Sequence, residues 1–179
     1  MPHRKKNKNR MNRNSYGFTL LEMVVVLVLI SIIAATVFTR SIGSDRINFV
    51  GQVDKIRNQI RYAQSMAMKR GEVWVFNCDT NDYWLSDISL NAVEFPGEKN
   101  AIISLPDLGI NMNALNVAFK VYFDRYGKPY HSYTDDDDEA TNTPVATGNT
   151  LKITISAVGD ASLSRELVIT PETGLVTTK

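Results

Sequence analysis

Cysteine and histidine are nearly absent from this sequence. Cys78 is its one cysteine, so the chain forms no internal disulfide and no cysteine-based metal cluster. His3 and His131 are its two histidines, and they stand too far apart to form a paired-histidine metal motif. We predict that Cys78 is a small apolar side chain packed in a strand rather than a reactive thiol.

Acidic residues are absent from the first 17 residues, which carry six basic side chains, namely Arg4, Lys5, Lys6, Lys8, Arg10 and Arg13. The other 14 basic residues face 19 acidic ones, so the chain beyond residue 17 has a net charge of about −5. Nucleic-acid binding depends on clustered Lys and Arg that contact phosphates. We therefore predict no nucleic-acid partner.

Catalytic motifs are also missing. Nothing in the sequence resembles a nucleophile elbow or a metalloprotease helix, so we predict that the protein is not an enzyme and has no cofactor. The acidic run 135–139 could bind calcium through its carboxylates, but it lacks the spaced pattern of a dedicated calcium loop. We predict a solvated acidic loop there.

Proline is absent from Phe18 to Arg70, and charge is scarce in the first part of that stretch. From Phe18 to Phe38 the only ionisable side chain is Glu22. A helix of this length is about 31 Å long, the thickness of a bilayer's hydrocarbon core. We predict a basic leader at 1–17 and a transmembrane helix at 18–39, with the N-terminus cytoplasmic.

A secretory signal peptide is the alternative interpretation of a basic start followed by an apolar run. The pair Ala34-Ala35 offers small residues for cleavage. The apolar run is, however, longer than the usual core of a signal peptide, and the helical pattern continues beyond it.

Residues 40–71 carry a one-face apolar stripe at spacings of three and four, which is typical of an amphipathic helix; its members are Phe49, Val53, Ile56, Ile60, Ala63 and Ala67. The residues between them should form a wet face: Gln52, Asp54, Lys55, Arg57, Asn58, Gln59, Arg61 and Gln64. Lys69 and Arg70 suit the last turn, and Gly71 suits the position after it. We predict one helix of about 50 residues, with Gly43 as the place for a bend.

After Gly71 the pattern becomes that of short strands separated by Asn, Asp, Pro and Gly. The expected strands are Glu72–Cys78, Tyr83–Leu85, Ala92–Phe95, Ala101–Leu105, Val117–Phe123, Lys128–Tyr133, Leu151–Ile155, Arg165–Thr170 and Leu175–Thr178. A polar loop spans 134–149. The fold class is α+β: a long N-terminal helix packed on an antiparallel β-sheet or sandwich domain at 72–179, with the helix stripe covering a sheet of six to eight short strands.

Aromatic residues are frequent on the helix and the first predicted strands: Tyr62, Trp74, Phe76, Tyr83 and Trp84. They could form a binding patch. Aromatic residues at strand spacing more commonly pack in the core, and we predict that role under the helix.

The segment Gly17-Phe18-Thr19-Leu20-Leu21-Glu22, followed by an apolar run, resembles the processing and assembly signal of type IV pilins and type II secretion pseudopilins. The resemblance covers residues 17–39. It implies that a prepilin peptidase cuts between Gly17 and Phe18 and methylates the new amine of Phe18. Glycine suits the cut because it lets another backbone approach closely.

The resemblance also implies that Glu22 faces the amine of a neighbouring subunit when the helices pack. Independently of the family, an ionised carboxylate in lipid is unfavourable and usually faces a partner. Alone, a carboxylate this close to the end of a span would be expected only to reach the interface. Beside Gly17-Phe18 and the basic leader, we predict the assembly role.

Three further motifs resemble minor pseudopilins of the H class: Arg61–Met68, Phe123–Pro129 and Val168–Gly174. The combination is most similar to a minor pilin of the mannose-sensitive haemagglutinin (MSHA) pilus. This resemblance implies a bacterial inner-membrane subunit with a periplasmic domain that later enters a pilus. Its partners would be the prepilin peptidase and methyltransferase, other major and minor pilins, and the inner-membrane assembly platform.

The sequence departs from the family in two ways. Thr39 stands where many pilins have a proline, and a C-terminal disulfide loop is excluded by the single cysteine. Two alternatives stay open: a minor subunit of a type II secretion pseudopilus, or a fibre-tip minor pilin that binds a ligand or DNA. The acidic composition beyond the leader argues against DNA.

Overall fold

The computed structural model describes residues 19–114, 118–134, 140–146, 148 and 150–179, without the side chains of residues 35–45. The chain divides into two compact units, Met1–Gly43 and Ser44–Lys179. The helix α1, Leu20–Arg70, contributes to both. The division falls at Gly43, where the sequence predicts a bend, and that bend stays a prediction.

In the first unit, α1 begins with an apolar surface exposed on every side. Its large apolar side chains between Leu20 and Ile33 are 43% to 83% exposed. Within the part of the chain that the structure describes, no helix combines the length and apolarity of a membrane span. The transmembrane role of 18–39 stays a prediction.

In the second unit, α1 buries one face and ends where the sequence predicts. All six residues of the predicted stripe are buried, from Phe49 at 5% exposure to Ala67 at 0%. Gly71 adopts a left-handed conformation (φ +69°), and its N–H donates to the carbonyl of Ala67 at 2.9 Å. Glycine adopts this conformation without steric strain, which explains the helix end at Arg70.

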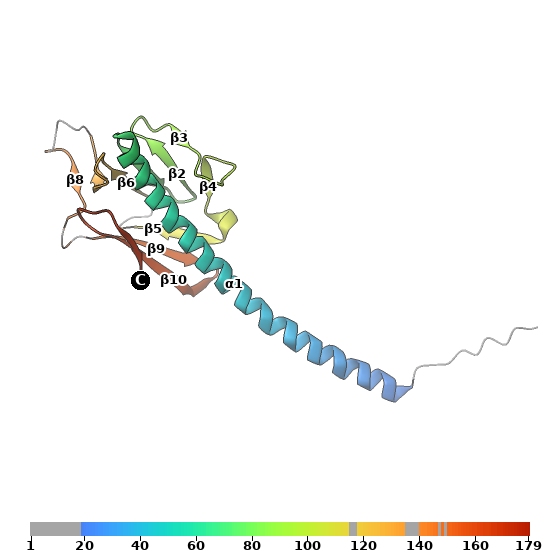
Figure 1. Cartoon of the computed structure of the whole chain (residues 1–179). Coiled ribbons are helices and arrows are strands. Elements are labelled where there is room, and N and C mark those ends of the chain that lie inside the picture. The colour runs from blue at the N-terminus through green and yellow to red at the C-terminus, as the bar shows by residue number, and fades with distance from the viewer. Residues whose placement is uncertain (1–18, 115–117, 135–139, 147, 149) are drawn as a thin grey trace, which may run out of the picture. The chain divides into compact units, whose positions relative to one another are not determined.

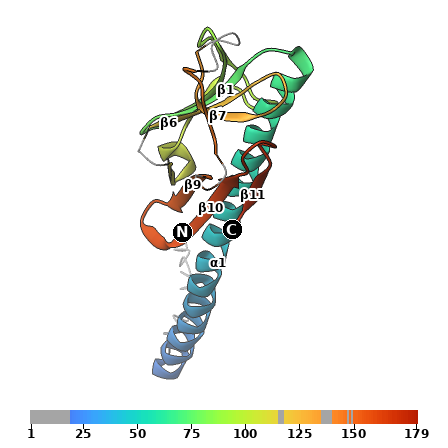
Figure 2. The ribbon, with the colours of Figure 1, turned by 90° about the vertical axis from the view of Figure 1, so that its left-hand side faces the viewer.

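Two antiparallel sheets pack beside this part of α1 (Figures 1 and 2). The seven-stranded sheet has the order β3 (Ala92–Val93), β2 (Asp82–Asp87), β1 (Trp74–Cys78), β6 (Phe119–Phe123), β7 (Pro129–Ser132) and β8 (Thr143–Pro144), with β4 (Ile102–Ser104) also paired to β2. The four-stranded sheet has the order β11 (Val176–Thr178), β10 (Asp160–Ile169), β9 (Leu151–Ala157) and β5 (Ile110–Asn113). A single 3-10 turn, Pro106–Leu108, precedes β5.

The core lies between the stripe of α1 and the inner faces of both sheets. Phe76 on β1 stacks on Tyr83 of β2 with ring centroids 5.7 Å apart, and both contact Phe95. From the second sheet, Ile153 and Leu167 are fully buried. The helix stripe is therefore the cover that both sheets need, as the predicted α+β class requires.

The sequence prediction underestimated the number of strands. The described residues form eleven strands in two antiparallel sheets, whereas six to eight strands in a sheet or sandwich were expected. The unpredicted strands β5 and β8 are short and rich in Asn, Thr and Pro, residues that favour loops. The pairing of β5 with β9 over four residues compensates for this low propensity.

Candidate functional site

The described part of the N-terminal motif starts at Thr19, because Gly17 and Phe18 lie outside the described residues. The Thr19 hydroxyl accepts a hydrogen bond from the backbone N–H of Glu22 at 3.2 Å, and the Thr19 carbonyl accepts one from Met23 at 3.2 Å. Thr19 is therefore the N-cap of α1, and Thr19 and Glu22 have the spacing of a capping box.

The Glu22 side chain is exposed in the first turn of α1. The large apolar residues around it are exposed too, including Leu21 at 75% and Met23 at 58%. From Leu20 to Ile33, α1 therefore exposes an apolar surface that carries one carboxylate, Glu22, near its start. Ser31, further along, satisfies its own hydroxyl by donating to the carbonyl of Leu27 at 2.7 Å.

A second site lies where α1 meets one turn from each sheet. Gln64 Nε2 donates to the carbonyl of Gly127, in the β6–β7 turn, at 2.9 Å. It also donates to the carbonyl of Thr173, in the β10–β11 turn, at 2.7 Å. We call the set Gln64, Gly127, Thr173 and Gly174 the turn junction. One side-chain amide thus joins the helix to both sheets.

The two glycines of the turn junction have close neighbours where a side chain would begin. A Cβ on Gly174 would lie 2.5 Å from Gln64 Nε2 and 2.6 Å from the carbonyl oxygen of Gly127. A Cβ on Gly127 would lie 3.0 Å from the sulfur of Met68. Both glycines have positive φ, +61° and +80°. Backbone conformation therefore favours glycine at both positions, and at Gly174 the close approach of the Gly127 carbonyl excludes a side chain as well.

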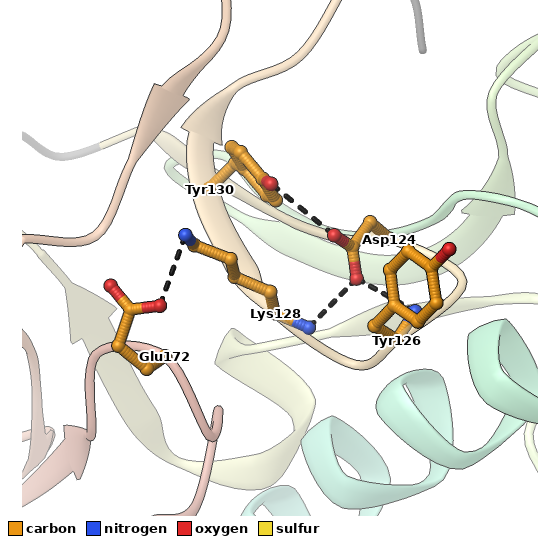
Figure 3. Close-up of polar contacts among 5 residues, drawn as sticks. All are labelled: Asp124, Tyr126, Lys128, Tyr130 and Glu172. Atoms are coloured by element: carbon orange, nitrogen blue, oxygen red, sulfur yellow. Dashed lines mark hydrogen bonds and ion pairs between the residues drawn. The ribbon is translucent and has the colours of Figure 1, made fainter. Parts of the chain in front are cut away.

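Asp124 organises the β6–β7 turn (Figure 3). Its Oδ1 accepts hydrogen bonds from the backbone N–H groups of Tyr126 at 2.8 Å and Lys128 at 2.9 Å, and its Oδ2 accepts one from the Tyr130 hydroxyl at 3.2 Å. Asp124 is only 7% exposed. Its burial is tolerated because these donors surround the carboxylate.

An ion pair links the two turns beside the turn junction. Lys128 Nζ lies 3.0 Å from Glu172 Oε2, between the β6–β7 and β10–β11 turns (Figure 3). Both side chains are partly solvated, so this pair stabilises the contact only modestly. The hydrogen bonds of Gln64 make the stronger connection.

The turn junction brings together the three later motifs that the sequence singled out. Gln64 belongs to Arg61–Met68, Gly127 to Phe123–Pro129, and Thr173 and Gly174 to Val168–Gly174. The helical pattern did not predict this contact, because it places Gln64 on the wet face. The glycines and the Asp124 turn were the signals that could have revealed it.

Gln59 is a second correction to the predicted wet face. It is 7% exposed, because it sits beside the buried stripe and bridges two partners. The Tyr83 hydroxyl donates to Gln59 Oε1 at 2.9 Å, and Gln59 Nε2 donates to Glu98 Oε1 at 3.0 Å. A buried amide with both ends hydrogen-bonded is compatible with the core.

Cys78 and His131 both line a cavity of about 390 Å³ at the end of β1. Burial, with Asp79 nearby, raises the pKa of the Cys78 thiol to about 12, so it stays protonated and unreactive. Burial lowers the pKa of His131. Among the described residues, no three His, Cys, Asp or Glu side chains are grouped so that they could hold a metal ion. The acidic run 135–139 lies outside the described residues.

The aromatic residues mostly follow the core prediction. Trp74, Phe76 and Tyr83 are buried, and Tyr62 packs edge-on against Phe95 with centroids 6.4 Å apart. Trp84 is the exception, since it is half-buried and lines the Cys78 cavity.

Comparison with known proteins identifies the N-terminal segment. Residues 12–38 match a family model described as the prokaryotic N-terminal methylation motif. The match spans Gly17, Phe18 and Glu22, and it supports a type IV pilin-like or pseudopilin subunit, a structural class rather than an enzyme class. Such a motif implies processing by a prepilin peptidase, assembly with other pilins, and a location in the membrane and then in a pilus. Searches of curated proteins and of solved structures gave no match.

Proposed function

We propose that this chain is a minor pilin, a structural subunit of an MSHA-type pilus. The observation that carries the proposal is the methylation motif at residues 12–38, which includes the lone carboxylate Glu22 in an apolar helix. The resemblance of the three later motifs to H-class minor pseudopilins supports the H-class part of the proposal. A minor subunit of a type II secretion pseudopilus is the alternative with the same motif.

Processing starts at the bond between Gly17 and Phe18. Hydrolysis leaves a carboxylate on Gly17, which departs with the basic leader, and a free amine on Phe18. Methylation of that amine keeps its positive charge. Thr19, as the N-cap, starts α1 only two residues after the cut, so the new amine lies close to the start of the helix.

Glu22 then provides the counter-charge for the amine of a neighbouring subunit. An ionised carboxylate at the centre of a membrane span is unfavourable by about 2.5–3.5 kcal/mol even on permissive scales, and by less near its end, so a partner stabilises it. The helix dipole also favours a negative charge in the first turn. The pairing would align neighbouring helices while their apolar surfaces pack together.

In this proposal the precursor sits in the bacterial inner membrane with its leader in the cytoplasm and residues after 40 in the periplasm. The peptidase and methyltransferase act at the cytoplasmic side. The assembly platform and other pilins then take the mature subunit into the fibre.

N-terminal mass spectrometry of the mature protein tests the processing. We expect the chain to begin at Phe18 and to carry an N-methyl group. A mature protein that keeps its leader, or one that begins beyond Ala35, would refute the proposal.

Glu22→Ala tests assembly separately from processing. We expect normal cleavage and methylation but reduced incorporation into fibres, measured by immunoblotting of sheared fibres. Glu94→Ala, which removes an exposed carboxylate from the second unit, is the matched control and should assemble normally. Wild-type incorporation of Glu22→Ala would contradict the pairing role.

A further inference from the structure

Two residues that line the Cys78 cavity, of about 390 Å³, each keep one buried polar atom without a hydrogen-bond partner in the described chain. These atoms are Asn77 Oδ1 and His131 Nε2. Asn77 as a whole is only 1% exposed. A buried polar atom without a hydrogen bond is unfavourable and rare in native proteins. Two of them beside one cavity indicate an occupant that supplies hydrogen bonds.

The orientation of the Asn77 amide is fixed by its neighbours in the sheet. Its Nδ2 donates to the Ser86 hydroxyl at 2.9 Å and to the Val75 carbonyl at 3.2 Å. A reversed amide would place its oxygen against the Val75 carbonyl, which can only accept a hydrogen bond. The unpaired atom of Asn77 is therefore an acceptor, and an occupant must meet it with an N–H or O–H donor.

Acceptors and donors around the cavity come from different strands. Asn77 belongs to β1 and Asp79 is the first residue after it, whereas Lys120 belongs to β6 and His131 to β7. Burial lowers the pKa of His131, so its imidazole is neutral at neutral pH and its Nε2 can carry a proton to donate. Because β1, β6 and β7 are consecutive in the sheet, acceptors gather at the β1 side and donors at the β6–β7 side.

The two charges that border the cavity have no ionic partner within the described residues. Among these residues, Lys120 is exposed and forms no ion pair with Asp79 or with any other acid. Asp79 Oδ1 accepts hydrogen bonds from the backbone N–H groups of Asn81 at 2.9 Å and Asp82 at 2.7 Å, which hold the carboxylate in place. A ligand with an ammonium group and a carboxylate would compensate both charges, whereas an uncharged ligand would desolvate them without compensation.

The rest of the cavity wall is apolar. Phe119 and Leu151 border it together with Trp84, which is half-buried and keeps part of its surface exposed. Binding sites for small molecules have volumes of about 300–1,000 Å³ and pair such apolar walls with a few polar groups. The volume of this cavity lies within that range.

We propose that the Cys78 cavity binds a free α-amino acid with an apolar side chain. The ammonium group of the ligand donates to Asn77 Oδ1 and pairs with Asp79. Its carboxylate accepts hydrogen bonds from Lys120 and His131 Nε2, and its side chain packs on Trp84. Both unpaired atoms are shielded from solvent, so the wall side chains adjust as the ligand enters. This site goes beyond the proposed function, because a structural subunit needs no small ligand.

Isothermal titration calorimetry of the full-length protein in detergent micelles tests the ligand class. The amino-acid probes are L-leucine and L-phenylalanine. Isopentylamine is leucine without its carboxylate, isocaproate is leucine without its ammonium group, and D-glucose is an uncharged polyol. We expect L-leucine to bind at least about tenfold more tightly than isopentylamine or isocaproate, because each analogue loses a charge-assisted contact. D-glucose should not bind.

Lys120→Gln and Asp79→Asn each remove one charge from the cavity. Both variants should keep the fold, because Lys120 is exposed and asparagine retains the oxygen that accepts from the turn after β1. We expect each variant to bind L-leucine about tenfold more weakly. In Lys120→Gln, L-leucine and isopentylamine should bind within about threefold of each other, because the ligand carboxylate has lost its charged partner. Lys99→Gln and Asp107→Asn, exposed and outside the cavity lining, are the matched controls and should bind L-leucine like the wild type.

Tryptophan fluorescence locates the site. Trp84 borders the cavity, whereas Trp74 lies in the core at 2% exposure. L-leucine should change the emission of the wild type, and Trp84→Phe should lose that change while calorimetry still detects binding. A fluorescence change that persists in Trp84→Phe would place the ligand elsewhere and overturn the assignment.

The other outcomes that overturn the proposal are equally specific. It fails if neither L-leucine nor L-phenylalanine binds, as expected if water alone satisfies Asn77 and His131. It also fails if D-glucose or isopentylamine binds as tightly as L-leucine, or if both cavity variants bind L-leucine like the wild type. None of these measurements requires a fibre, so the proposed function, which Glu22→Ala tests, stands or falls separately.

Discussion

The side-chain amide of Gln64 donates a 2.9 Å hydrogen bond to the backbone carbonyl of Gly127, across 63 residues of sequence. The same nitrogen reaches Thr173 in the other sheet. Because one planar amide serves both contacts, its position fixes the two turns relative to the helix.

Gly174→Ala should destabilise the protein by about 3 kcal/mol, because a Cβ would overlap the Gly127 carbonyl and the residue would keep a left-handed conformation. Chemical denaturation of the detergent-solubilised protein measures the effect. Gly97→Ala is the control: Gly97 also has positive φ, but its Cβ position is open, so the loss should be only about 1 kcal/mol. Equal losses at the two sites would show that the junction is not tightly packed.

Asp124→Ala should cost about 3 kcal/mol, since it leaves the N–H groups of Tyr126 and Lys128 without their acceptor. Amide hydrogen exchange should accelerate at these two residues before the rest of the sheet. Tyr130→Phe removes only the hydroxyl donor to Asp124, and about 1 kcal/mol should be lost. Unchanged exchange at Tyr126 in Asp124→Ala would count against the role of the carboxylate.

Thr19→Ala should weaken the first turn of α1 by about 1 kcal/mol, because the hydroxyl that accepts the Glu22 N–H is lost. Faster amide exchange at Glu22 in detergent micelles is the expected readout. Thr19→Ser retains a capping hydroxyl and should behave like the wild type. If alanine and serine gave the same exchange rate, Thr19 would not be the cap.

His131 should make the folded state less stable in mild acid. Burial lowers its pKa in the folded protein below the usual 6.5, so the unfolded chain binds the proton more readily. Its contribution is therefore present above pH 6.5 and lost as the pH falls through the lowered pKa, with a slope of at most about 1.4 kcal/mol per pH unit. Denaturation between pH 7 and pH 5 measures this loss.

His131→Gln is the control for that pH dependence. The variant should flatten the stability profile in the acid range, because glutamine does not titrate. Cys78, Asp79 and Lys120 line the same cavity and remain unchanged, so any dependence they contribute persists in the variant. An identical acid slope in both proteins would assign the pH effect to other groups.

Sequence patterns predicted the elements whose periodicity is long and regular. The stripe from Phe49 to Ala67 is buried residue for residue, and Gly71 ends the helix as expected. Strands β1, β6 and β9 fall within two residues of their expected bounds at each end that the structure describes. One face of each of these segments packs against the core, so its apolar residues recur at a regular spacing. That spacing indicates a helix or a strand from the sequence alone.

Contacts between distant turns could not be predicted in the same way. The position of Gln64 in the helix pattern indicates a polar face, and only the packing of two turns against that face makes it a half-buried donor. Strand β10 is longer than expected, and its pairing with β9 continues to Asp160 beyond a register shift between Asp160 and Ser164. The loop carrying Pro96 and Glu98 lines a cavity beside α1, and no local pattern indicates the path of that loop.

The last strand is held to the helix by two arginines. Arg61 Nη2 donates to the Val176 carbonyl at 2.7 Å, and Arg57 Nη1 donates to the Thr178 hydroxyl at 3.3 Å. Tension applied along this part of the helix would therefore load β11 in shear. The two arginine hydrogen bonds and the hydrogen bonds between β10 and β11 would then resist the load together instead of breaking one after another. If the chain is a fibre subunit as proposed, its C-terminal hairpin would stay attached while the helix is drawn out of a membrane or stretched within a fibre.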